Sequence, residues 1–163
     1  MLLVSWVSSK TTGKICKVTG ANHVATGALI GASFSAPVAL PLALVSHFVL
    51  DSLPHHSQAH YSKRSRQFTY IFAADVLLAT AVAVLIAVHR PAHWGLMLVA
   101  AFLAVCPDAM WLPAYIRTIR QREHLPHNRL MVWHKKIQRE YEWGYVTEAV
   151  WIILMSIFLR HSL

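Results

Sequence analysis

Three apolar segments, each about as long as a lipid bilayer is thick, constrain the fold of this chain most strongly. They cover residues 68–88, 94–116 and 144–160, and charged residues or prolines bound each of them. A hydrocarbon core about 30 Å thick requires about 20 apolar residues in an α-helix. The sequence therefore predicts an all-α fold, a polytopic helical membrane protein in which these segments are the longer spans.

The charge balance agrees with a membrane protein. Hydrophobic residues make up 56% of the 163 residues, and 15 Lys and Arg stand against 7 Asp and Glu. This is not the composition of a disordered tail or of a soluble nucleic-acid-binding protein, so we expect no nucleic acid as a partner. A basic balance on an apolar background is typical of an integral membrane protein whose positive charge lies at anionic lipid headgroups.

The stretch of residues 21–53 is too long for one simple span and carries Pro37 and Pro41 near its middle. Proline removes a backbone donor and clashes with the preceding helical turn, so a break is expected there. One interpretation is a single kinked span, which would be the first of four. The other is a hairpin of two short helices, residues 22–35 and 38–53.

The distribution of positive charge favours the hairpin. In that arrangement only Arg90 and Arg160 lie across the membrane from the other thirteen Lys and Arg, whereas the kinked span divides them ten to five. Positive charge gathers on the cytoplasmic side of a membrane. We therefore prefer the hairpin, with its open end cytoplasmic.

The remaining segments complete a simple organisation. We predict an N-terminal tail over residues 1–20 and a single helical membrane domain over residues 21–163, with a basic loop over residues 117–142. Within this loop, residues 130–137 are apolar on one side and cationic on the other. That pattern is typical of a helix lying in the membrane interface.

A dense group of polar residues lies at the end of the second short helix. His47 and Asp51 are four residues apart and project from one helix face, and Pro54 places His55 just past the helix end. Two imidazoles and a carboxylate are usual ligands of a catalytic zinc-like ion. Asp51 also lies at a helix C-terminus, where the helix dipole disfavours an anion, so another group is expected to stabilise it. The alternative is a set of wetted side chains at the membrane interface.

The hairpin makes a chemical prediction about His23. It brings His23 beside His47 and Asp51, whereas one straight helix would hold these groups about 36 Å apart. Gly27 and Gly31 form a small-residue stripe on the same helix. Such a stripe allows close helix packing, and we expect it to serve the hairpin.

Each of four further residues has more than one interpretation. Asp75 lies deep in an apolar segment, so it requires a partner, either structural or at a metal site. Asp108 either caps a helix over residues 109–122 or binds metal. Glu148 is a general base, a more distant partner of the metal site, or an interfacial acid near a helix start. His134 lies at the border of the amphipathic stretch and either faces the interface or turns toward the metal.

The pattern of these residues resembles a known family. The matching blocks are His23 with Thr26-Gly27-Ala28 and Gly31, then Ser46-His47-Phe48-Val49-Leu50-Asp51-Ser52-Leu53-Pro54-His55, then Asp75, Pro107-Asp108 and the stretch from His134 to Gln138. They resemble small bacterial membrane-bound metal-dependent hydrolases, which are distantly similar to zinc-dependent phospholipase C and P1-type nucleases. The resemblance covers residues 22–138, and the His-x3-Asp-x2-Pro-His block is its most specific element.

The resemblance implies a divalent metal ion, foremost zinc, and a location in the bacterial cytoplasmic membrane. The metal-site residues that it implies are His23, His47, Asp51, His55, Asp108 and His134. Asp75 is implied as a supporting acid, and with Glu148 it makes up the predicted catalytic pair.

These observations predict a multi-pass, metal-dependent hydrolase with its site at the cytoplasmic face. The basic loop predicts an anionic substrate, such as a phosphoester or a lipid headgroup. The alternative is a non-enzymatic membrane protein, either a metal-stabilised scaffold or an ion- or proton-handling component. Intramembrane acids would line a pathway in an ion-handling protein.

Overall fold

The computed structural model describes residues 19–56, 66–111, 129–141 and 143–163 of the chain, and these are mostly helical, at 84%. The fold is therefore all-α in its main features. Its elements in order are α1 (Gly20–Ser33), α2 (Ala36–Ser52), β1 (Pro54–His56), α3 (Arg66–His89), α4 (Trp94–Val105), the 3-10 helix η2 (Cys106–Trp111), α6 (Arg129–Ile137), β2 (Arg139–Tyr141) and α7 (Gly144–Arg160).

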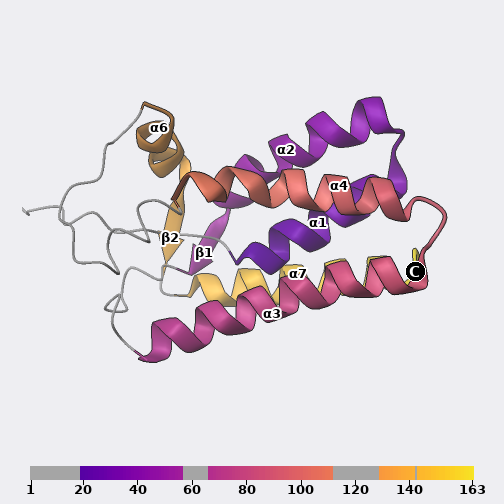
Figure 1. Ribbon diagram of the computed structural model, residues 1–163. Helices are drawn as coiled ribbons and strands as arrows, with labels where there is room; N and C mark the ends of the chain where they lie inside the picture. Colours follow the sequence, from indigo (N-terminus) through magenta and orange to yellow (C-terminus); the bar gives the residue numbers. More distant parts are fainter. Residues whose placement is uncertain (1–18, 57–65, 112–128, 142) are drawn as a thin grey trace, which may run out of the picture.

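Helices α1 and α2 are separate and form an antiparallel hairpin (Figure 1). Phe34 and Ser35 lie between them in extended conformations. Pro37 lies in the first turn of α2, where a missing backbone N–H leaves no helical hydrogen bond unmade. Pro41 lies inside α2 without ending it. Of the two arrangements that the sequence left open, the structure contains the hairpin.

Helix α1 lies at the centre of the bundle and contacts α2, α3, α4 and α7. Its residues are buried from Gly20 to Ala28, as expected of a helix surrounded by others. The stripe of Gly27 and Gly31 faces α4 and not α2, which corrects the expectation that it serves the hairpin. A Cβ at Gly27 would lie 2.5 Å from the Ala100 carbonyl oxygen, and one at Gly31 would lie 2.7 Å from the Met97 Cα.

Substitution of Gly27 by alanine is expected to destabilise the bundle. The new methyl group overlaps the backbone of α4, so α1 and α4 must move apart at a cost of about 1–3 kcal/mol. Thermal unfolding in a mild detergent measures this change. The matched control is Gly95→Ala in α4, where a Cβ meets nothing within 4 Å. Equal unfolding temperatures for the two variants would contradict the close packing of α1 on α4.

One helix in the described part of the chain is long and apolar enough to cross a membrane. It covers Tyr70–His89, with 20 residues and a mean hydropathy of 2.6. Ala36–Ser52 and Trp94–Met110 are shorter apolar helices. The predicted segment 94–116 changes at Cys106 from α-helix to 3-10 helix, and residues 112–116 lie outside the described ranges.

The end of the bundle that holds the start of α1 also holds β1, β2 and α6 (Figure 1). Strands β1 and β2 pair in parallel, with His55 opposite Glu140, and the sequence did not predict this pairing. The turn between α3 and α4 and the C-terminus lie at the other end. Most of the N-terminal tail, the loop residues 117–128 and most of the helix proposed over 109–122 lie outside the described residues.

Candidate metal centre

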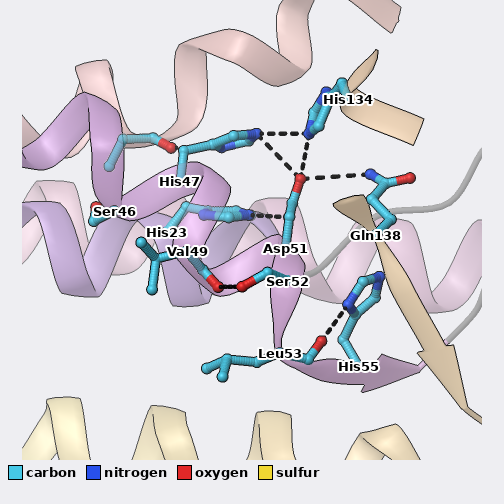
Figure 2. A network of polar contacts seen from close by, with 12 residues as sticks. His23, Ser46, His47, Val49, Asp51, Ser52, Leu53, His55, His134 and Gln138 are labelled. Carbon is cyan, nitrogen blue, oxygen red and sulfur yellow. Dashed lines mark hydrogen bonds and ion pairs between the residues drawn. The ribbon is translucent and has the colours of Figure 1, made fainter. Parts of the chain in front are cut away.

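The carboxylate of Asp51 lies at the centre of a buried group of histidines (Figure 2). Its Oδ1 lies 3.3 Å from His23 Nε2, and its Oδ2 lies 3.3 Å from His47 Nε2. His134 Nε2 is in hydrogen-bond contact with Oδ2. Gln138 Nε2 also donates to Oδ2, at 3.4 Å. All three histidines are 0% exposed and Asp51 is 1% exposed, so the group is closed to bulk solvent.

Three helices supply this group, each for a local reason. His47 and Asp51 lie one turn apart on the same face of α2, because residues at i and i+4 are neighbours on a helix. The hairpin brings His23 from the first turn of α1 to the last turn of α2, and its ring stacks on His47 at 4.3 Å. His134 comes from α6, whose Trp133 packs edge-on against Phe48 of α2.

The hydrogen bond made by the other ring nitrogen of His47 determines how this imidazole is presented. His47 Nδ1 donates to the carbonyl oxygen of Ala104 over 2.8 Å. A carbonyl oxygen can only accept, so Nδ1 carries the proton and a neutral ring keeps a lone pair on Nε2. Ala104 lies near the end of α4, where carbonyl groups have no helical partner. This is how proteins orient metal-binding histidines.

His55 has the same arrangement. Its Nδ1 donates to the carbonyl oxygen of Leu53 over 2.9 Å, and its Nε2 is buried without a hydrogen-bond partner among the described residues. Figure 2 shows the ring near the group but joined only to Leu53. The sequence placed His55 with Asp51, and the structure buries it at the same end of the bundle.

Several buried polar atoms of the group lack hydrogen-bond partners in the described part of the chain. They include Nδ1 of His23 and Nε2 of His55, whereas His23 Nε2 and Asp51 Oδ1 contact each other at 3.3 Å. Each such atom costs about 1–3 kcal/mol when left unpaired. Donor atoms of His23, His47 and Asp51 all lie within 4.8 Å of one another and can hold a metal ion. Imidazole nitrogens and a carboxylate oxygen fit a divalent cation, which would satisfy these atoms together.

Asp108, the remaining predicted ligand, is 5% exposed and lies in η2, directly after α4. It interacts electrostatically with His47. Its donor atoms are not among the set of His23, His47 and Asp51 that converge within 4.8 Å.

Asp75, predicted to support the metal site or to act in catalysis, binds the backbone at the start of α1. Its Oδ2 accepts a hydrogen bond from the Gly20 backbone N–H at 2.8 Å, and its Oδ1 accepts one from Ala21 at 2.9 Å. These donors are among the unpaired N–H groups at the start of α1, where a carboxylate is favoured. Asp75 therefore fixes the helix end that carries His23.

Glu148 also binds backbone. Its Oε1 accepts a hydrogen bond from the His56 N–H at 3.0 Å, which ties α7 to β1. Gly144, one turn earlier in α7, packs so closely on β1 that a Cβ would lie 2.0 Å from the carbonyl carbon of His55. Sequence reasoning missed this contact, as it missed Gln138, although Gln138 follows His134 at the i+4 spacing.

Compared with protein-family models, with curated proteins and with solved structures, the chain matches none. Its functional interpretation therefore depends on the residues and geometry described above.

Proposed function

We propose that this protein is a membrane-bound, metal-dependent hydrolase of the family that its motifs resemble. The observation that carries the proposal is a buried carboxylate in contact with Nε2 of three histidines from three helices. In this proposal Asp51, His23, His47 and His134 are the metal ligands. His55 lies beside them and has an unpaired Nε2 among the described residues.

Zinc is the ion that this donor set fits best. Zinc is commonly bound by nitrogen and oxygen ligands, and three histidines with one carboxylate complete a tetrahedron. Magnesium and calcium favour sites made of oxygen ligands. A divalent ion held by these residues would need a water as a fifth ligand for catalysis, and it would lower the pKa of that bound water and polarise a phosphoryl or acyl oxygen.

The outer surface of the bundle supports a membrane location. Large apolar side chains are exposed along four helices, α2, α3, α4 and α7, and they include Val45, Val49, Leu77, Val88, Phe102, Ile153 and Phe158. Soluble monomers rarely expose so continuous an apolar surface. Arg90 follows the last residue of α3 and Arg160 is the last residue of α7, and these helix ends lie at the end of the bundle away from β1, β2 and α6 (Figure 1). We propose a multi-pass protein of the cytoplasmic membrane with the site on the cytoplasmic side.

Exposed cations lie near the site and favour an anionic substrate. Arg129 and Lys136 of α6 and Arg139 of β2 are exposed at the end of the bundle that holds the histidines. A phosphoester, either free or in a lipid headgroup, has the complementary charge. In this scheme Asp75 and Glu148 act as positioning residues, because they hold α1 and β1, which carry His23 and His55.

The hydrolase is tested with purified protein and a set of phosphoester and phospholipid substrates. Wild-type protein is expected to release product, and His47→Ala is expected to lower the rate by about 100-fold or more, since a metal ion supplies several kcal/mol. The matched control is His93→Ala, which removes an exposed histidine before α4. Equal rates for the wild type and the His47→Ala variant would contradict a role of this site in catalysis.

A metal-stabilised scaffold is the second candidate, and the burial of the site favours it. Structural zinc sites have four protein ligands and no open position, and His23, His47, Asp51 and His134 are all at most 1% exposed. A scaffold predicts that metal removal by a chelator unfolds the protein, while wild-type protein releases no product from any substrate.

A further inference from the structure

Helix α6 holds a residue of the candidate metal centre on one face and leaves its other faces exposed. Met131 and His134, three residues apart, form the buried face, and His134 contacts Asp51. The helix contacts α2 at the end of the bundle that also holds β1 and β2 (Figure 1). Leu130 and Trp133 are also three residues apart, and each is about half exposed. Residues at this spacing share a helix face, so these two form an apolar band beside the buried face.

The apolar band of α6 adjoins the outer surface of α2. Trp133 packs edge-on against Phe48 of α2, with the ring centroids 5.2 Å apart. Val45 and Val49 lie within one turn of Phe48 and are exposed. These valines belong to the surface that we propose to face lipid. The apolar band therefore extends this surface to the end of the bundle that holds the metal centre.

Exposed cations form a third face of α6. Arg129 and Lys136 are two helical turns apart, and both are exposed on the side opposite Met131 and His134. Arg139 of β2 is exposed at the same end of the bundle. A helix with an apolar band beside a cationic face suits the boundary between acyl chains and anionic headgroups.

The length of α6 also indicates that it needs a second surface to pack on. It has nine residues, and isolated helices shorter than about 12–15 residues are marginally stable in water. We propose that α6 docks on an anionic membrane surface, with its apolar band at the acyl chains and its cations at lipid phosphates. Because α6 carries His134, docking also holds this ligand at the metal centre. The proposal rests on the proposed function for its membrane location and its metal centre, and not on hydrolysis.

Nitroxide labels test the position of α6 in full-length protein in lipid nanodiscs that contain phosphatidylglycerol. Leu130→Cys and Val132→Cys are labelled separately in protein whose native Cys16 and Cys106 are replaced by alanine. Both positions are exposed, and they project about 200° apart around the helix. The label at position 130 is expected to collide with oxygen, which concentrates among acyl chains, and the label at position 132 with a water-soluble nickel complex. Equal accessibility of the two labels to the nickel complex would overturn the docking.

Zinc affinity tests the coupling between docking and His134. Zinc is titrated into protein in nanodiscs of phosphatidylcholine alone and in nanodiscs that also contain phosphatidylglycerol. Wild-type protein is expected to bind zinc about tenfold more tightly in the anionic nanodiscs, because cations at an anionic surface stabilise the docked helix. The double variant Arg129→Gln, Lys136→Gln is expected to lose most of this difference.

The matched control is the double variant Arg90→Gln, Arg160→Gln, which removes the same charge at the other end of the bundle. An anionic surface concentrates zinc near every variant, so the comparison between the two double variants isolates the effect of docking. Equal lipid dependence in the two double variants would contradict the coupling. Wild-type protein that binds no zinc in either nanodisc would refute the metal centre and the coupling with it, whereas the labels decide the docking independently.

Discussion

Asp51→Ala protein is expected to purify with less than about one-tenth of the metal that is expected in wild type. Its free energy of unfolding is expected to be lower by about 3–5 kcal/mol. The side chain of Asp51 contacts all three histidines, His23, His47 and His134. Its loss removes the negative charge that makes buried imidazoles a strong site for a cation. Elemental analysis and thermal unfolding in detergent measure the two effects.

Asp51→Asn separates the charge from the shape. Asparagine keeps the size of the side chain and one oxygen, so it is expected to retain more stability than alanine while still losing most of the metal. Ser52→Ala is a control on the neighbouring residue, because within the described part of the chain the Ser52 hydroxyl donates to the Val49 carbonyl and not to the histidine group. If Asp51→Asn protein retained a full equivalent of metal, the carboxylate would not be a ligand.

Of the glycine-to-alanine substitutions in the described part of the chain, Gly144→Ala is expected to reduce the free energy of unfolding most. Its Cβ would lie 2.0 Å from the carbonyl carbon of His55 and 2.4 Å from the His56 nitrogen. Backbone atoms cannot rotate away as a side chain can, so α7 and β1 must separate at a cost of about 3 kcal/mol or more. The movement also breaks the hydrogen bond between His56 and Glu148.

Two measurements check this prediction. Thermal unfolding in detergent is expected to show a much lower midpoint for Gly144→Ala than for Gly95→Ala, whose Cβ meets nothing within 4 Å. Proteolysis of the native protein near β1 is expected to be faster in the Gly144 variant. A midpoint equal to that of Gly95→Ala would show that α7 does not approach β1 this closely.

The residues that sequence reasoning predicted best are those whose relation is local. His47 and Asp51 meet because they are four residues apart on one helix. His23 joins them through the hairpin, which the two prolines and the distribution of Lys and Arg indicate from the sequence alone. For His134 the sequence allows two orientations, toward the membrane interface or toward the metal, and in the structure α6 brings it to Asp51.

Residues whose partners are distant in sequence were not predictable in the same way. Gly27 and Gly31 indicated a close helix contact, but no pattern identified α4 as the partner. The carbonyl oxygen of Ala104 orients His47. Because every residue has a backbone carbonyl, the sequence does not show which one accepts this hydrogen bond. Asp75 required a partner, and that partner is the backbone at the start of α1. These contacts depend on tertiary packing, which local propensity does not specify.

X-ray absorption at the metal edge of purified wild-type protein tests the central claim most directly. We predict about one zinc ion per chain, bound by three imidazole nitrogens and one carboxylate oxygen at about 2.0–2.2 Å. The imidazole contribution is expected to fall in His23→Ala, which removes one ligand. Two results would contradict the assignment of this group as a metal centre. One is protein that purifies from metal-replete cells without stoichiometric metal, and the other is a first coordination sphere without histidine.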